Sequence, residues 1–230
     1  AGGHNNRITS DVMLSSVSGW AVQGGTGNDR VINNGQVFGN LDLGAGDNRF
    51  INRAGASFMA FDTIRLREGE PTLTAQSFSP MAMVVDGEEA TFTNEGVFRM
   101  GLDSAGWPID LAAGETFGNW DDLAAKQDNV YYGARVITTV ELDGNFVQTA
   151  TGSSVFDVAF GNYASDRVNL TGNAHVEGQV AINLMWLDDA KAVTLFATEG
   201  TGSVGDVQID GTMALNFSLK GDDAGVHLLV

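Results

Sequence analysis

The stretch VNLTGNAHVEGQVAINL, residues Val168 to Leu184, decides the fold. Every even position in it is apolar or glycine, and every odd position except Ala181 is polar. Such alternation is typical of a β-strand with one buried and one wet face, but strands usually end within about ten residues. Gly172 and Gly178 fall on the inward row, where a residue without a Cβ lets a strand bend sharply. The stretch therefore predicts strands that turn corners, as in a β-solenoid.

Related phrases recur along the chain, which indicates a repeat protein. VNLTGNAHV aligns with VQIDGTMAL, which begins at Val207, at an offset of 39 residues, and VELDGNFVQ from Val140 is a weaker copy. TGNDRVIN from Thr26 and AGDNRFIN from Ala45 align at an offset of 19 residues, and TFTNEGVF from Thr91 echoes VINNGQVF about three such periods downstream. These offsets predict about 20 residues per turn and roughly ten turns, with Val168 two turns from Val207 on the same side.

Composition supports an all-β fold and narrows the function. The 230 residues include 30 glycines, 3 prolines and 43% hydrophobic residues, which suits short strands and glycine turns around a real core. The formal net charge of −17 argues against a nucleic-acid partner, because phosphate binding needs a basic patch. The absence of cysteine excludes disulfides, thiolate catalysis and cysteine-bound metal sites.

These patterns predict one all-β domain over residues 1–230, a single-stranded parallel β-helix. Residues 1–135 would form the N-terminal turns and an irregular insertion near 101–133, where the alternation breaks down. Residues 136–230 hold the longest alternations and should act as the folding nucleus, because well-patterned turns of a solenoid form first. Three recurring asparagines are predicted at corners between strands, since Asn tolerates the left-handed conformation: Asn33, Asn52 and Asn94.

One stretch fits a calcium motif. GGTGNDRVI, residues 24–32, matches the nonapeptide G-G-x-G-x-D-x-U-x. Gly27 and Asp29, with Gly46 and Asp47 of the related LGAGDNRFI, are the candidate calcium ligands, because calcium prefers carbonyl and carboxylate oxygens. Known sites of this kind stack copies about nine residues apart, whereas these two lie about 20 residues apart. We therefore expect plain corners here, and neither a metal nor another cofactor.

The insertion supplies the candidate partner-binding residues, Trp107, Trp120, Tyr131 and Tyr132. Solenoids often carry insertions as loops on the binding face. The alternative is that these aromatic side chains fold the loop back over the core, because clustered aromatics bury a large area.

The sequence supports no catalytic site. His4, His175 and His227 are far apart in the chain, and no H-E-x-x-H, G-x-S-x-G or P-loop motif occurs. Adjacent acidic pairs such as Asp188–Asp189 lie in surroundings typical of solvated turns. We therefore expect no catalytic residue and no enzyme.

The phrases as a set resemble a known family. TGNDRVINNGQVFGNLDLGAGDNRFIN, the TNEG step, DGNFVQTATGSSVFDV and SDRVNLTGNAHVEGQVAINL resemble the C-terminal half of pertactin-like autotransporter passenger domains, over nearly the whole chain but less so in residues 100–135. The resemblance implies a right-handed parallel β-helix, exported by type V secretion across the outer membrane of a Gram-negative bacterium and displayed on the cell surface or released. It also implies an outer-membrane β-barrel translocator encoded after Val230.

Three functions follow as alternatives. The first is a non-catalytic structural or adhesive stalk, displayed on the surface or secreted. The second is a subunit of a surface layer or extracellular filament, and the third is a β-helix enzyme acting on polysaccharides. The 12 basic residues are too sparse to favour the enzyme. The expected partners are other copies of the chain, stacked end to end, or other cell-surface components.

Overall fold

The computed structural model describes residues 6–60, 63–65, 90–100, 138–160, 165–186, 192–211 and 215–230. These residues form eighteen strands joined in one sheet. The strands are β1 (Arg7–Ser10), β2 (Met13–Thr26), β3 (Arg30–Asn33), β4 (Gln36–Ala45), β5 (Arg49–Asn52), β6 (Ser57–Ala60), β7 (Thr63–Arg65), β8 (Thr91–Asn94), β9 (Val97–Met100), β10 (Thr139–Leu142), β11 (Asn145–Gln148), β12 (Ser153–Ala159), β13 (Arg167–Leu170), β14 (Ala174–Trp186), β15 (Ala192–Thr198), β16 (Gly202–Asp210), β17 (Ser218–Asp222) and β18 (Gly225–Leu229).

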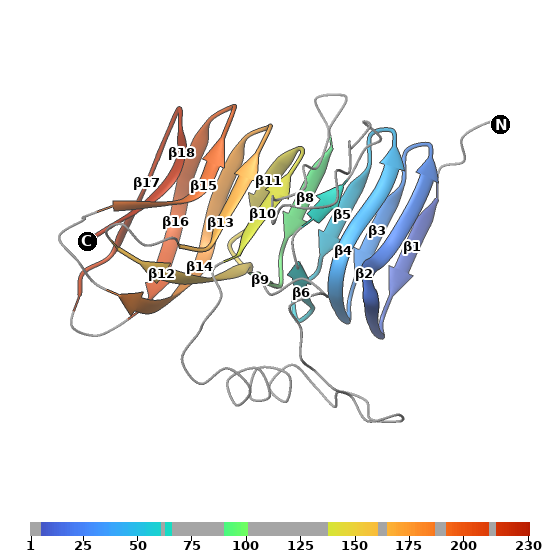
Figure 1. Ribbon diagram of the computed structural model, residues 1–230, viewed down its shortest axis with the longest axis horizontal. Helices are drawn as coiled ribbons and strands as arrows, with labels where there is room; N and C mark the ends of the chain where they lie inside the picture. The colour runs from blue at the N-terminus through green and yellow to red at the C-terminus, as the bar shows by residue number, and fades with distance from the viewer. Residues whose placement is uncertain are drawn as a thin grey trace.

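The strands stack one after another along the long axis of the molecule, from β1 to β16–β18 (Figure 1). Equivalent strands of successive turns form three ladders, which we call faces A, B and C. Face A contains β1, β3, β5, β8, β11 and the first parts of β14 and β16. Face B contains the first parts of β2 and β4, then β6, β9, β12 and the later parts of β14 and β16. Face C contains the later parts of β2 and β4, then β7, β10, β13 and β15.

Every pairing on these three faces is parallel. Parallel neighbours need a crossover, and here each crossover is the rest of one turn around the axis. The described residues thus form an all-β parallel β-helix, which confirms the predicted fold class.

The length of a turn changes along the molecule. Asn33 pairs with Asn52, 19 residues later, as the N-terminal repeat predicts. Farther along, Glu141 pairs with Asn169, 28 residues later. The later turns are longer because a separate connection joins β12 of face B to β13 of face C, whereas β4 runs through both faces without a break.

Val168 and Val207, which the repeat phrases align, do not stack above one another in the structure. Val140 pairs with Val168, so the weaker copy of the repeat phrase is one turn away. Val168 stacks in turn on Phe196 of face C, whereas Val207 lies beside Gly178 on face B. The prediction that Val168 and Val207 lie two turns apart on the same side was therefore wrong.

Two turns are longer still. Asn52 pairs with Asn94, 42 residues later, and Asn94 pairs with Gln148, 54 residues later. Among the described residues, face A therefore holds seven stacked positions, against about ten turns predicted for the chain. The echo TFTNEGVF occupies the equivalent place two turns after VINNGQVF, not three. The predicted insertion near 101–133 lies outside the described residues.

The stretch that decides the fold behaves as its alternation predicts. It forms β13 and the long strand β14, in which Val168, Val176 and Val180 are fully buried. The chain bends at Gly178, whose φ is +75°. A Cβ at this position would lie 2.5 Å from the carbonyl oxygen of Gly152 in the preceding turn, so the corner requires glycine.

Aromatic rings fill much of the interior. Phe50, Phe92 and Phe146 stack on successive strands of face A, with ring centroids 5.3 Å apart at both steps and steeply inclined planes. Phe146 then contacts Phe196 of face C, with centroids 4.7 Å apart. The edge-to-face packing of Phe50, Phe92 and Phe146 adds to the free energy gained by burying the rings. The core is therefore continuous from the N-terminal turns into the C-terminal ones.

The C-terminal end departs from the parallel pattern. Strand β18 pairs antiparallel with both β15 and β17, so the final hairpin lies against the last turn of face C. The inward residues of β16, the last parallel strand, are only partly buried: Val204, Val207 and Ile209.

Candidate functional site

A line of buried amide side chains crosses the interior where face A meets face B. Its members are the last residues of β3, β5, β8 and β11, and all are fully buried: Asn33, Asn52, Asn94 and Gln148. Asn33 Nδ2 donates to Asn52 Oδ1 over 2.9 Å, and Asn52 Nδ2 donates to Asn94 Oδ1 over 2.9 Å. Asn94 Nδ2 donates to Gln148 Oε1 over 3.1 Å. We call this line the amide ladder. The sequence predicted corners at Asn33, Asn52 and Asn94, but it predicted neither the place of Gln148 nor the inward, hydrogen-bonded side chains.

The amide ladder has a direction. Besides its side-chain acceptor, each asparagine Nδ2 donates to a main-chain carbonyl of the following turn. Asn33 binds the carbonyl oxygen of Ser57 at 2.9 Å, and Asn94 binds that of Ser153 at 3.0 Å. Both amide hydrogens of a given asparagine therefore bind the turn on its C-terminal side. A buried donor left without a partner costs about 1–3 kcal/mol, so each asparagine favours docking onto that neighbour.

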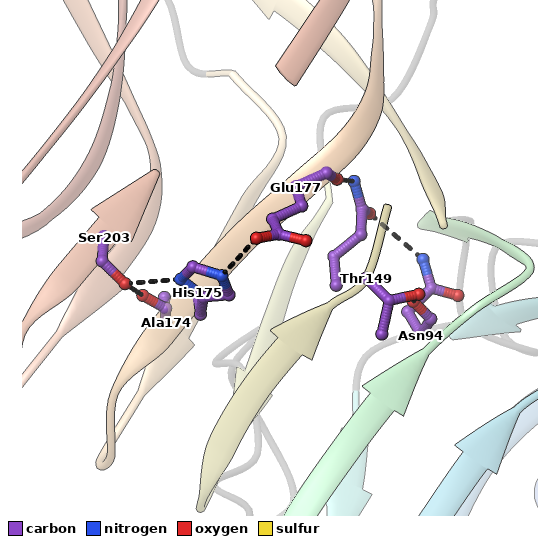
Figure 2. A network of polar contacts seen from close by, with 7 residues as sticks. Asn94, Thr149, Ala174, His175, Glu177 and Ser203 are labelled. Atoms are coloured by element: carbon purple, nitrogen blue, oxygen red, sulfur yellow. Dashed lines mark hydrogen bonds and ion pairs between the residues drawn. The ribbon is translucent and has the colours of Figure 1, made fainter. Parts of the chain in front are cut away.

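The polar network continues from the amide ladder to the surface, as Figure 2 shows. Gln148 Nε2 donates to the carbonyl oxygens of Glu177, at 2.6 Å, and Gln179, at 2.9 Å. The carboxylate of Glu177 lies 3.2 Å from Nε2 of His175, and Nδ1 of His175 lies 2.8 Å from Oγ of Ser203. The buried amide ladder is thus connected, through β14, to an outer cluster formed by Ser203, His175 and Glu177.

Ser203, His175 and Glu177 follow the order nucleophile, base and carboxylate of an acyl-transfer site. The surroundings differ from such a site, because the side chains of His175 and Glu177 are 40% and 36% exposed. Oγ of Ser203 also lies 3.2 Å from the carbonyl oxygen of Ala174, which competes for the hydroxyl proton. Stabilising an oxyanion depends on donors fixed in a water-excluded site. The cluster can exchange protons and hydrogen bonds with solvent, and we assign it no catalytic role.

A second histidine fastens the terminal hairpin to the last turn. Nε2 of His227, on β18, lies 3.0 Å from Oδ1 of Asp222 on β17. Nδ1 of the same ring lies 3.0 Å from Oγ1 of Thr194 on β15. The backbone N–H of Ala224 donates to Asp222 and, with His227, holds the pKa of that carboxyl below its usual range. This cluster therefore joins three strands at the C-terminal end. His4, the third histidine, lies outside the described residues.

Two carboxyls in the C-terminal turns have raised pKa values. Burial raises the pKa of Asp166 to about 8, although its two carboxyl oxygens accept backbone hydrogen bonds from Thr138 and Asp157 at 2.7 and 2.8 Å. Burial also raises the pKa of Glu141, while the hydrogen bond from Asn169 acts in the opposite direction. The sequence around Asp166 did not predict that its side chain is buried.

The calcium candidates lie at stacked corners. Gly27 and Gly46 have φ values of 124° and 119°, the region that glycine tolerates best. Asp29 is buried, and its Oδ1 accepts hydrogen bonds from the backbone N and the Nδ2 of Asn6, at 2.8 and 2.9 Å. Asp47 donates its backbone N–H to the neighbouring turn. Within the described ranges, no three or more His, Asp or Glu side chains are grouped to hold a metal ion.

The four aromatic candidates for partner binding, Trp107, Trp120, Tyr131 and Tyr132, lie outside the described residues. In the part of the chain that the structure describes, no helix is long and apolar enough to cross a membrane.

Comparisons of the chain with protein families, with curated proteins and with solved structures found no match. The fold and the contacts above are therefore the basis for assigning a function.

Proposed function

We propose that the protein is a non-catalytic β-helix stalk, displayed on a cell surface or secreted, with a structural or adhesive role. The amide ladder is the observation that carries this proposal. Its asparagines use both of their amide hydrogens to join one turn to the next, so the buried polar groups serve cohesion along the rod. A stalk needs such cohesion, because each turn of a solenoid contacts only its neighbours.

Export by the autotransporter route is part of the proposal. The sequence phrases resemble passenger domains, and the parallel β-helix is the fold that this resemblance implies. The chain also contains no cysteine, so no disulfide would hinder passage through a pore unfolded. On this proposal the protein crosses the outer membrane of a Gram-negative bacterium through a β-barrel translocator encoded after Val230.

Labelling of intact cells tests the location. Antibodies raised against the purified chain are applied to cells of the bacterium that carries the gene, with and without permeabilisation. We expect labelling of intact cells that disappears after brief external protease treatment, while a periplasmic marker stays protected. Labelling that requires permeabilisation would contradict surface display, and antigen free in the medium would favour the secreted form.

A filament or surface-layer subunit is the second candidate, favoured by the two ends of the rod. Val204 and Ile209 of β16 remain partly exposed at one end, and Ile8 and Val12 are 40% and 64% exposed at the other. End-to-end stacking would cover both sets. Sedimentation velocity across a range of concentrations distinguishes the candidates, since a stalk stays monomeric and a filament subunit grows into a series of larger species.

A further inference from the structure

The N-terminal end of the rod is an open strand edge. Strand β1 is the outermost strand at this end (Figure 1), and among the described strands it pairs with β3 alone. The carbonyl oxygens of Asn6 and Ser10 accept hydrogen bonds from the next turn, at 2.8 and 2.7 Å. Successive residues of a strand direct their backbone groups to opposite sides, so the N–H and C=O groups of Arg7 and Thr9 point away from β3. Such an edge is a template for pairing with another strand.

Apolar side chains at this end are uncovered as well. Ile8 pairs with Val31, which is 1% exposed and belongs to the core, so Ile8 lies on the inward row of the first turn. Ile8 itself is 40% exposed, because β1 is the end strand, and Val12, which precedes β2, is 64% exposed. Covering both side chains with another protein surface is favourable, since it removes apolar area from water.

The C-terminal end is closed differently. Strand β18 of the final hairpin covers β15, and β17 lies against the start of β16, where a Cβ at Gly221 would be 2.5 Å from the carbonyl oxygen of Gly202. The charge is also uneven along the rod. Residues 1–100 hold seven basic and eleven acidic residues, a formal charge of −4, whereas residues 101–230 carry −13. Two copies therefore meet with the least repulsion, and with an open strand edge on each, at their N-terminal ends.

From these features we propose that two copies of the chain join through their N-terminal ends, with the β1 strands antiparallel about a two-fold axis. A two-fold axis makes the interface self-complementary, because every contact between the copies occurs twice. Antiparallel strands exchange hydrogen bonds between residues whose backbone groups point at each other. Thr9 of one copy, placed opposite Thr9 of the second copy, meets this condition. Ile8 is then covered on the inward side, beside Ser10 of the second copy.

This register also matches charges. It places Arg7 of each copy opposite Asp11 of the other, so two attractive pairs form on the outer side. Both side chains are exposed, and among the described residues no acidic side chain forms an ion pair with Arg7. Asp11 accepts a hydrogen bond from Asn34 through Oδ1, at 2.7 Å, and its Oδ2 can bind a guanidinium group. In the neighbouring registers Thr9 lies opposite Arg7 or Asp11, and both charge pairs are lost.

The dimer replaces the single chain expected of a stalk with a closed pair of rods joined at their N-terminal ends. Association stops at two chains, because a two-fold interface uses the same surface on both copies. A filament subunit would instead form a series of larger species. The dimer does not depend on display at a cell surface, so surface labelling and the measurements below can fail separately.

Sedimentation velocity of the purified full chain, over a wide range of concentrations, tests the dimer. We expect one larger species with twice the mass of the 24.2 kDa chain, in equilibrium with the monomer. A monomer at every concentration would overturn the proposal. Species larger than the dimer would also overturn it, because a closed interface leaves no surface for further growth.

Charge exchange tests the register. Arg7→Asp and Asp11→Arg are made as separate variants at exposed positions, and circular dichroism checks that each folds. In either variant alone, both charge pairs become like charges, so the dimer should weaken by about tenfold or more. When the two variants are mixed, the introduced charges face each other and the unchanged charges face each other, and both pairs are attractive. The mixture should therefore dimerise about as tightly as the unchanged chain.

Asp223→Arg is the matched control for Asp11→Arg. It makes the same change of charge at an exposed position near the other end of the rod, and it should dimerise at least as tightly as the unchanged chain. If Asp11→Arg dimerises as tightly as this control, β1 is not at the interface. If the mixture of Arg7→Asp and Asp11→Arg dimerises no more tightly than either variant alone, the antiparallel register is wrong.

Discussion

Asn52 donates a hydrogen bond from its Nδ2 to the Oδ1 of Asn94, 2.9 Å away in space and 42 residues later in the chain. The bond belongs to the amide ladder, which keeps the same geometry across a 19-residue turn and across turns more than twice as long. Extra residues have thus been added between the strands without changing how the strands stack. The interior fixes the register, and the length of the connections varies around it.

Replacing Asn52 with alanine tests the amide ladder. The change leaves Asn33 Nδ2 without its side-chain acceptor and Asn94 Oδ1 without its donor, both in the buried interior. We expect the free energy of unfolding to fall by about 2–4 kcal/mol, measured by urea denaturation. Asn34→Ala is the control, because Asn34 is exposed and its side chain bonds Asp11 at the surface, at 2.7 Å. Equal effects of the two changes would show that the ladder adds little to stability.

Gly178→Ala should destabilise the protein more than Gly55→Ala does. Both glycines have positive φ, 75° and 82°, so alanine is strained at either position. A Cβ at residue 178 would also lie 2.5 Å from the carbonyl oxygen of Gly152, whereas a Cβ at residue 55 meets nothing within 4 Å. We expect a cost of about 1 kcal/mol at residue 55 and about 3 kcal/mol at residue 178. Thermal unfolding of the two variants measures the difference, and a larger effect at residue 55 would contradict the close approach.

Asp166 should make the protein less stable as the pH rises. Its pKa is about 8 in the folded protein, against an ordinary value of 3.8. Between these values the unfolded chain has lost the proton that the folded chain keeps, so the free energy of unfolding falls with rising pH and levels off above about pH 8. Urea denaturation at pH 5, 7 and 9 measures this dependence.

The variant Asp166→Asn should be less stable throughout, because its Nδ2 cannot accept one of the two backbone hydrogen bonds, but it should lack this part of the pH dependence. Asp210→Asn, at an exposed position, controls for the loss of one carboxyl. If Asp166→Asn keeps the full dependence of the unchanged chain, another group is responsible.

Removing calcium with a chelator should leave the melting temperature unchanged. The Oδ1 of Asp29 already accepts two hydrogen bonds from Asn6, so the corner is held by the chain itself. Asp29→Ala should lower the melting temperature equally with and without calcium. A rise of several degrees on adding calcium, lost in Asp29→Ala, would establish a metal site instead.

The C-terminal turns should be the most persistent part of the fold. The direction of the amide ladder supports this order, because an asparagine that docks onto its C-terminal neighbour immediately satisfies both amide hydrogens. Val176→Asp places a carboxylate at a fully buried position and should prevent folding of the whole chain. Val37→Asp, at an equally buried position in the N-terminal turns, should spare a C-terminal fragment. Hydrogen exchange and limited proteolysis report the difference, and a protected fragment from residues 1–100 would contradict it.

The sequence predicted the fold class because alternation is a direct signal of which side chains face the core. The corner at Gly178 and the 19-residue turn from Asn33 to Asn52 were both predicted from the residue pattern. The 28-residue spacing was missed because the best alignment of repeat phrases matched Val168 to Val207. Both residues belong to inward-facing rows, but Val168 lies on face C and Val207 on face B. Periodicity identifies the buried side of a strand but does not say which strand lies beside it.

Less of the candidate site could be predicted. Asn94 and Gln148 differ in side-chain length and lie 54 residues apart, so their bond is set by the stacking alone. The contact between His175 and Ser203 likewise depends on the 28-residue register, which the sequence did not supply. The antiparallel hairpin carrying His227 was also not predicted, since alternation is the same in parallel and antiparallel strands.

The unequal turns have a consequence for a molecule under tension. Hydrogen bonds between strands run along the rod axis, so a pull on the two ends loads one turn at a time rather than the whole sheet at once. Each 28-residue turn that opens would release about 95 Å of chain, and a 19-residue turn about 65 Å. A parallel β-helix of this kind, pulled at its two ends, would yield in steps and would lengthen many-fold before the load reached a covalent bond.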